Sequence, residues 1–190
     1  MSTLFVVAGP SGVGKGTVLA EFRRRHPEVV FSISVTTRPP RPGERDGVDY
    51  FFVSRPEFEE ISRSGGFLEW FEVYGDLKGT PRAAVEEQLS AGRDVLLEID
   101  VQGALAVREQ MPTAVLVFLA PPSRAEQLRR IESRGHDDPD AVGRRLAAAA
   151  EEEARSSHFD AIVVNEQVEQ AVEQLTAILN SRRAGGTPGT

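Results

Sequence analysis

The sequence has no cysteine, and only three of its 190 residues are histidine. The lack of cysteine excludes disulfides, zinc–thiolate sites and cysteine nucleophiles. The histidines are His26, His136 and His158, and their spacing matches no metal-ligand pair. We expect them at the surface or in a lid rather than around a metal ion.

Long apolar runs and an excess of positive charge are also missing. No run approaches the ~20 residues of a membrane span. A strand is expected from Leu4 onward, which leaves no room for a secretory signal before it. The formal charge of −7 argues against a broad nucleic-acid surface. We expect one soluble, cytoplasmic domain that needs no nucleic acid, membrane or obligatory protein partner.

A glycine-rich stretch between an apolar run and a helical pattern is the strongest signal in the sequence. It consists of Gly9, Pro10, Ser11, Gly12, Val13, Gly14, Lys15, Gly16 and Thr17. Strand, glycine turn and helix together predict a phosphate-binding loop, whose backbone N–H groups surround an anion at a helix N-terminus. Lys15 adds a mobile positive charge. Gly16 stands where Ser or Thr is usual, so Thr17 must supply any hydroxyl near a magnesium ion, through water.

An apolar run over 94–100 ends in carboxylates, with Asp100 last. A phosphate-binding loop needs an acidic strand end beside it to hold magnesium or its waters. Asp100 is therefore the second predicted magnesium residue, also through water. Helical patterns follow over 101–110, and a further buried strand over 114–120.

The region 33–80 breaks the alternation of strands and helices. We predict strands over 29–35, 49–53 and 67–74, a helix capped by Ser54, and another with Pro81 at its first position. These short elements predict a small α+β lobe inserted into an α/β core. Arg38 and Arg41 lie in a proline-stiffened loop and are either solvated surface charges or an anion clamp. Glu69, among apolar residues, is either an exposed strand carboxylate or one aimed into a pocket.

Arginines gather in the next two predicted helices. The first is capped by Ser123 and runs to 134, with Arg130 and Arg134 on one face. The second carries Arg144 and Arg145, which either face a polyanion or pair with the acidic run 151–153. This segment is typical of a mobile arginine lid. A last strand over 160–165, a helix over 168–179 and a flexible tail over 183–190 complete the chain.

Four motifs in this order resemble the guanylate kinases, from Leu4 to about Leu179. They are GPSGVGKGT, SVTTRPPRPGE with DGVDYFF, EIDVQGA, and RRIESRG with RRL. The resemblance implies a P-loop NTPase three-layer α/β fold with a mostly parallel five-stranded core sheet. It implies a core over 1–32, 89–122 and 151–182, a GMP-binding lobe over 33–88, and a helical lid over 123–150.

The resemblance also implies a role for each matching residue. The guanine base is read by Ser34, Glu69, Thr80 and Asp100, and the GMP phosphate is held by Arg38, Arg41 and Tyr50. ATP is bound by the loop from Gly9 to Thr17 and by Asn165, at an expected adenine contact. The predicted catalytic residues are Lys15, Arg38, Arg130, Arg134 and Arg145.

One position departs from the family pattern. Lys78 stands where the family often has a tyrosine that donates to the GMP phosphate. An ammonium can also hold a phosphate, as a point charge on a flexible stem. Lys78 is therefore included among the predicted GMP-binding residues, with Tyr74 nearby.

The implied reaction is phosphorylation of GMP, and of dGMP, by ATP with Mg²⁺ through direct in-line transfer. A phosphate monoester is largely deprotonated at neutral pH, so no general base is required. Charge neutralisation and alignment are what the reaction needs. The alternatives are a non-catalytic interaction module of the same fold and a P-loop kinase for another phosphate ester. The intact loop and lid disfavour the first alternative, and Glu69 with Asp100 disfavours the second.

Overall fold

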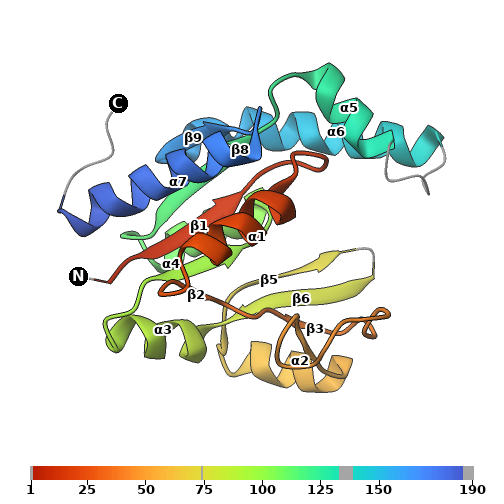
Figure 1. The fold of residues 1–190 in the computed structure, drawn as a ribbon. Helices are drawn as coiled ribbons and strands as arrows, with labels where there is room; N and C mark the ends of the chain where they lie inside the picture. Colours follow the sequence, from red (N-terminus) through yellow and green to blue (C-terminus); the bar gives the residue numbers. More distant parts are fainter. Residues whose placement is uncertain (1, 74, 133–138, 186–190) are drawn as a thin grey trace.

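The protein folds into a core sheet covered by helices on both faces, with a smaller sheet attached at one side (Figure 1). The computed structural model describes residues 2–73, 75–132 and 139–185. Its elements are β1 (Leu4–Ala8), α1 (Lys15–Arg25), β2 (Val30–Phe31), β3 (Val35–Thr36), β4 (Phe51–Phe52), α2 (Arg55–Arg63), β5 (Phe67–Val73), β6 (Asp76–Pro81), α3 (Arg82–Ser90), β7 (Val95–Glu98), α4 (Val101–Gln110), β8 (Val115–Ala120), α5 (Arg124–Glu132), α6 (Pro139–Ala154), the 3-10 turn η1 (Ser156–His158), β9 (Ala161–Val164) and α7 (Val168–Arg183).

The core sheet has five strands in the order β2-β7-β1-β8-β9, and every pairing is parallel. This confirms the predicted core. Parallel strands are buried on both faces, which explains why β1 and β8 are almost uninterrupted apolar runs. Their carboxyl ends all meet at one edge of the sheet, and the loops that leave this edge form the candidate site.

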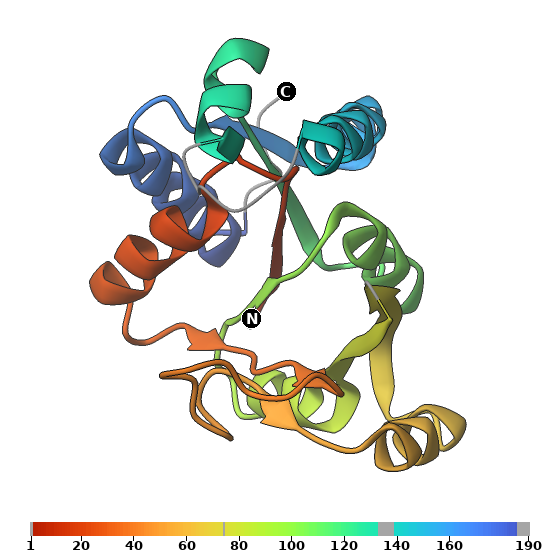
Figure 2. The same cartoon turned by 90° about the vertical axis from the view of Figure 1, so that its right-hand side faces the viewer.

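Two apolar clusters cover the two faces of this sheet. Phe5 and Val7 pack with α1 and α7, which lie side by side in Figure 2. Leu4 and Val6 point the other way and pack with α4 and residues of α3 and β5. The sheet is thereby fixed between layers, as expected for a three-layer fold. Within the described part of the chain, no helix is both long and apolar enough to cross a membrane.

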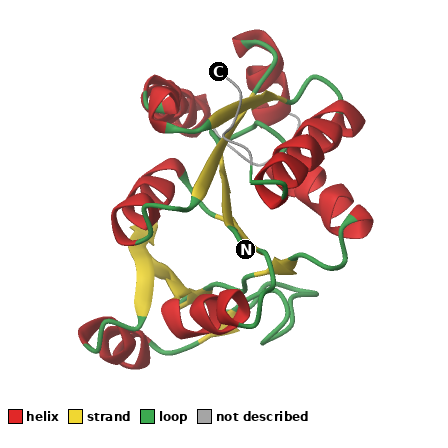
Figure 3. Cartoon of the chain, turned by 90° about the vertical axis from the view of Figure 1, so that its left-hand side faces the viewer, coloured by secondary structure: helices red, strands yellow, loops and turns green. Residues whose placement is uncertain are grey.

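The smaller sheet has the order β4-β3-β6-β5 and belongs to the inserted lobe. Figure 3 shows the long loop segments beside it, between β3 and β4. The prediction of one strand over 29–35 was wrong. Ser32 donates its backbone N–H to Leu96 at the end of β2, and the chain then leaves the core so that Val35 pairs with β4 and β6. The predicted run over 29–35 therefore contributes β2 to the core sheet and the start of β3 to the smaller sheet.

Strand β6 was not predicted. It pairs with β5 in an antiparallel hairpin in which Gly75 has φ 88°, a conformation that favours glycine. Pro81 is the last residue of β6 and the N-cap residue of α3, so it precedes the first turn of this helix. The prediction of Pro81 at the first helical position was therefore wrong. The capping box of Ser54 and Glu57 at the start of α2 is present as predicted.

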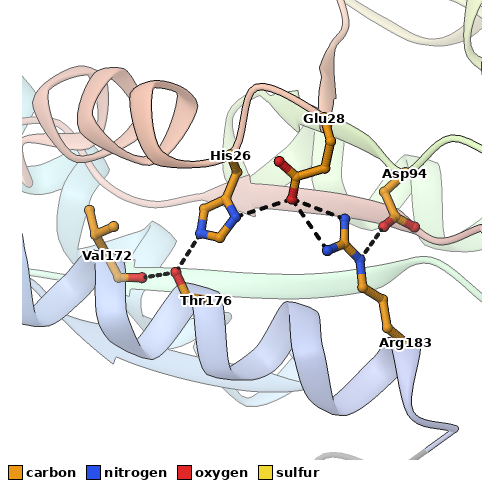
Figure 4. A network of polar contacts seen from close by, with 6 residues as sticks. All are labelled: His26, Glu28, Asp94, Val172, Thr176 and Arg183. Carbon is orange, nitrogen blue, oxygen red and sulfur yellow. Dashed lines mark hydrogen bonds and ion pairs between the residues drawn. The ribbon is translucent and has the colours of Figure 1, made fainter.

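A network of polar contacts ties the last helix to the amino-terminal ends of the core strands (Figure 4). Asp94 accepts from the Thr3 backbone N–H at 2.8 Å and from Arg183 Nε at 2.7 Å. Arg183 also reaches Glu28 at 3.3 Å, and His26 contacts Thr176 at 2.8 Å. These contacts explain why α7 continues to Arg183, four residues past the predicted end of this helix, and why Arg183 is not part of a tail.

Replacing Asp94 by alanine should lower the free energy of unfolding by about 2 kcal/mol, because a charge-assisted bond and an ordered backbone contact are lost together. Urea denaturation measures this loss. The matched control is Glu173→Ala, an exposed carboxylate of α7, which should change the unfolding free energy by no more than about 0.5 kcal/mol. Equal losses in both variants would show that the network contributes nothing.

Candidate active site

The glycine-rich loop leaves the carboxyl end of β1 and leads into α1, as predicted. Gly12 and Gly14 have φ values of 82° and 86°. Gly9 lies so close to β8 that a Cβ there would be 2.3 Å from the Leu119 carbonyl oxygen. These glycines are needed for the shape of the loop, because a side chain at any of the three would strain the backbone or displace a neighbour.

The Val13 carbonyl joins the loop to two distant segments. It accepts from Asn165 Nδ2 at 2.7 Å and from Arg130 Nη1 at 3.1 Å. Arg130 also donates to the Asn165 carbonyl at 3.2 Å and, through Nε, to Glu126 at 2.8 Å. Asn165 is buried, and its Oδ1 is an acceptor without a hydrogen-bond partner among the described residues. Asn165, a predicted ATP-binding residue, and Arg130, a predicted catalytic residue, are thus held against the loop.

Lys15 connects the loop with the acidic end of β7. Strands β1 and β7 are adjacent and Val7 lies opposite Glu98, so the lysine that follows β1 reaches the residues that follow Glu98. Lys15 Nζ donates to the Ile99 carbonyl at 2.7 Å. Burial lowers the pKa of the Lys15 ammonium, and the Glu98 carboxylate opposes this effect. The predicted lysine and acidic strand end therefore form one site.

Asp100 occupies the start of α4. One of its carboxylate oxygens accepts from the Gly103 backbone N–H at 2.6 Å, which makes Asp100 the N-cap of this helix. Such a cap satisfies a helix donor that would otherwise lack a partner. The same contact fixes the direction of the carboxylate toward the candidate site.

Glu69 is a buried carboxylate aimed into the site from the inserted lobe. It lies opposite Thr80 in the β5–β6 hairpin, and the Thr80 hydroxyl donates to it at 2.5 Å. A Cβ on Gly103 would be 3.2 Å from Glu69 and 3.3 Å from Asp100, so both carboxylates face this glycine. Burial raises the pKa of Glu69 to about 7, with a further contribution from Asp100 and an opposing one from Thr80. Of the two predicted alternatives for Glu69, the structure has the pocket residue.

Arg38 is held by a carboxylate that was not predicted to take part. Its Nη1 and Nη2 donate to the two oxygens of Glu44 at 2.6 and 2.7 Å. The Arg41 backbone N–H also donates to Glu44, and the Arg38 pair holds the pKa of this carboxyl at about 2. The guanidinium of Arg38 lies 4.9 Å from the centre of the Tyr50 ring. A phosphate offers two oxygens in the same bidentate geometry as the Glu44 carboxylate, so it could bind Arg38 in the same way.

Many of these groups line two cavities, and Lys15 lines the first of them. The first, of about 360 Å³, is lined by Lys15, Ser32, Ser34, Asp49, Tyr50, Glu69, Phe71, Lys78, Glu98, Ile99 and Asp100. The second, of about 340 Å³, is lined by Gly12, Gly14, Thr17, Glu126, Arg129, Arg130, Asn165, Glu166 and Val168. The first cavity thus brings together the predicted residues Lys15, Ser34, Tyr50, Glu69, Lys78 and Asp100. Thr80 and Arg38 do not line it but contact Glu69 and Tyr50, which do.

Some predicted residues are not brought together. Thr17 and Asp100, the two predicted magnesium residues, line different cavities. Among residues 2–73, 75–132 and 139–185, no three histidine or acidic side chains gather around a possible metal position. Arg134 lies outside the described residues. Tyr74, which is close to Lys78 in the sequence, also lies outside them. Arg145 belongs to α6, at a position where the backbone alone is described.

Several residues of the site were not predicted from the sequence, and four of them are polar groups with a clear place in it. Glu44 and Glu98 stand inside motifs that were recognised, and only their spacing from Arg38 and Asp100 marks them. Ser32 was predicted as a strand residue, but it lines the first cavity, and its buried hydroxyl has no hydrogen-bond partner in the described part of the chain. Glu126 follows a predicted cap, yet its carboxylate pairs with Arg129 and Arg130.

Comparison with known proteins gives one consistent family. The family model for guanylate kinase matches residues 1–182. The chain is 56% identical to a guanylate kinase of Thermus thermophilus, over 98% of this chain and 84% of that one. It is 55% identical to a guanylate kinase of Streptomyces coelicolor, over 93% of this chain and 90% of that one. The crystal structure of guanylate kinase from Anaplasma phagocytophilum superposes with a TM-score of 0.78 at 35% identity, covering 95% of this chain and 86% of that one.

The raised pKa of Glu69 predicts a pH-dependent stability. The folded protein binds a proton at Glu69 that the unfolded chain releases near its ordinary pKa of 4.5, so the free energy of unfolding falls as the pH rises from 4.5 to about 7. Between pH 5 and pH 8 this group should remove about 2–3 kcal/mol. Over the same interval, the free energy of unfolding of Glu69→Gln should therefore fall by about 2–3 kcal/mol less than that of the unmodified protein. Urea denaturation at both pH values measures this difference.

The control for this experiment is Glu72→Gln, on the same strand but exposed. Its pH dependence should follow that of the unmodified protein. A Glu69→Gln variant with an unchanged slope between pH 5 and pH 8 would contradict the raised pKa.

Proposed function

The chain belongs to the guanylate kinase family, and we propose that it transfers the terminal phosphoryl group of ATP to GMP, and to dGMP, giving the nucleoside diphosphates. One observation carries this proposal. A buried carboxylate, Glu69, opens onto the same cavity as Lys15, so a nucleobase acceptor and the donor phosphates have adjoining places.

Glu69 has the chemistry that guanine requires. Guanine presents two donors, N1–H and the 2-amino group, and one ionised carboxylate accepts both. Adenine presents a lone pair at N1, which would face the carboxylate oxygen and leave it unpaired. Sites that hydrogen-bond a substrate group reject analogues lacking it by about 10⁴–10⁵. We assign Ser34, Thr80 and Asp100 to the same base site, with Thr80 holding Glu69 in place.

The acceptor phosphate is assigned to the cationic side of the first cavity. Lys78 lies with its Nζ 5.2 Å from the centre of the Tyr50 ring, and Arg38 lies over the same ring. We therefore assign the phosphate of GMP to Arg38, Arg41, Tyr50 and Lys78. Its oxygen needs no base, since the second pKa of a phosphate monoester is ~6.

The donor ATP is assigned to the loop and the second cavity. Backbone N–H groups of the loop and the helix N-terminus of α1 suit an anion, and Lys15 lines the first cavity while Gly14 and Thr17 of the same loop line the second. The unpartnered Oδ1 of Asn165 is an acceptor for the amino group of adenine. Arg130, Arg134 and Arg145 are assigned to the transferring phosphoryl group, where arginine contacts can contribute ~10³–10⁵ in rate. We propose a cytoplasmic location for this reaction.

We also propose that the reaction uses Mg²⁺, held chiefly by phosphate oxygens and water. Magnesium commonly keeps several waters and needs only one or two protein oxygens. Asp100 has one carboxylate oxygen engaged by Gly103, which leaves the other for a metal-bound water. When bound, the ion neutralises charge on the phosphates. Thr17 is assigned a contact through water on the donor side.

Release of ADP should be rapid with GMP and dGMP and close to background with AMP, CMP and UMP. Replacing Glu69 by glutamine puts an amide donor against a guanine donor, and kcat/KM for GMP should fall by about 10² or more. A coupled ADP-release assay measures both results. In the control variant Glu72→Gln, kcat/KM should match that of the unmodified protein, and full GMP turnover by Glu69→Gln would refute the base assignment.

The missing hydroxyl at position 16 predicts a weak affinity for Mg²⁺, which one substitution can raise. A Cβ on Gly16 would meet nothing within 4 Å, so serine fits there. Gly16→Ser should lower the Mg²⁺ concentration for half-maximal rate by about two- to tenfold, since one added polar contact contributes about 0.5–1.5 kcal/mol. Gly16→Ala fills the same space without a hydroxyl and should leave that concentration unchanged. Identical Mg²⁺ titrations for the two variants would count against the role of the hydroxyl.

A further inference from the structure

The basic residues of this chain are distributed unusually. Lys15 and Lys78 are the only lysines in the sequence, whereas the other twenty basic side chains are arginines. Both lysines line the same cavity, although they are 63 positions apart and come from the core and the lobe. Apart from the terminal amine, every primary amine of the protein therefore faces the first cavity. A reagent that attacks amines can modify a side chain only at this site.

The two lysines differ in how their amines are held. Lys15 Nζ donates to the Ile99 carbonyl at 2.7 Å, next to the loop. Lys78 is half-buried on β6, and its closest described interaction is with the ring of Tyr50, 5.2 Å from Nζ to the ring centre. Among the described residues, no carboxylate oxygen lies within 4 Å of Lys78 Nζ, whereas most arginines of the lobe have such a partner. Lys78 is thus the more accessible nucleophile.

A small anion can bind beside this amine by replacing the Glu44 carboxylate on Arg38. In the described part of the chain, the guanidinium of Arg41 has no carboxylate within 4 Å, and Arg38 holds Glu44 in the bidentate geometry that also suits a phosphate. Lys78 and Arg38 both lie over the Tyr50 ring, so a phosphate bound by these cations is held close to the Lys78 nitrogen. A reagent with an electrophilic carbon attached to a phosphate would be concentrated there.

We propose that Lys78 is a site of N-acylation by small acyl phosphates, which the cations of the acceptor-phosphate site bind through their phosphate group. The unprotonated Lys78 nitrogen attacks the carbonyl carbon, so that a C–N bond forms and the bond from that carbon to the phosphate oxygen breaks. Inorganic phosphate leaves with the electron pair, and the proton from the nitrogen passes to water. The product is a neutral amide, and no oxidant or reductant is needed.

Acylation removes one positive charge from the cavity and adds a side-chain extension over Tyr50. Both changes act against the binding of a dianionic phosphate at this position. The expected loss of GMP turnover rests on the proposed function, whereas formation of the amide does not. Acylation of Lys78 would thus control the binding of the acceptor phosphate.

The test uses the full chain, incubated with acetyl phosphate and followed by intact mass and peptide mapping. Lys78 should be acetylated about tenfold faster than either Lys15 or the terminal amine, because bound reagent has a raised effective concentration. Inorganic phosphate should slow this step. With p-nitrophenyl acetate, a neutral donor without a phosphate, the preference for Lys78 should disappear.

The control variant Lys78→Arg keeps the charge and removes the nucleophile. It should show no adduct at this position, and its activity should resist acetyl phosphate. Acetylation of Lys15 or the terminal amine before Lys78, or the same distribution with both donors, would overturn the proposal. An amide that forms at Lys78 without loss of GMP turnover would support the modification and refute only the assignment of Lys78 to the GMP phosphate.

Discussion

The Val13 carbonyl is the point on which the geometry of the site depends. A backbone oxygen in a glycine-rich loop has no partner from regular secondary structure, and here it accepts from Asn165 and Arg130. One donor follows the last core strand and the other belongs to α5, so the loop is tied to the far edge of the sheet and to the base of the arginine-rich segment. Its shape is therefore set by tertiary contacts as well as by its glycines.

Much of the fold could be predicted because local rules and the global fold agree. The apolar runs of β1, β7 and β8 required burial on two faces, and the parallel sheet supplies it. The cap at Ser54 marked a helix start from local chemistry. The failure at 29–35 has a different cause. Periodicity cannot say which sheet a strand joins, and the split after Ser32 depends on where Leu96 and the lobe offer partners.

The site was predicted where a residue's role follows from its own motif, as with Lys15 and the glycines. It was missed where the role of a residue depends on a contact that only the folded chain forms. Glu44 looks like surface charge until Arg38 is seen to close on it. The local sequence left the burial of Glu69 open between two alternatives, because this burial results from the hairpin with Thr80 and from the approach of Gly103 on another element. Sequence spacing encodes none of these distances.

The network around Asp94 and Arg183 lies at the ends of the strands where the chain enters the sheet, whereas the glycine-rich loop and the acidic strand end lie where it leaves. The two regions share no residue. Active sites often trade stability for activity because the same strained groups serve both. In this chain, substitutions around Asp94 and Arg183 can therefore raise the free energy of unfolding without touching the residues that face the nucleotides.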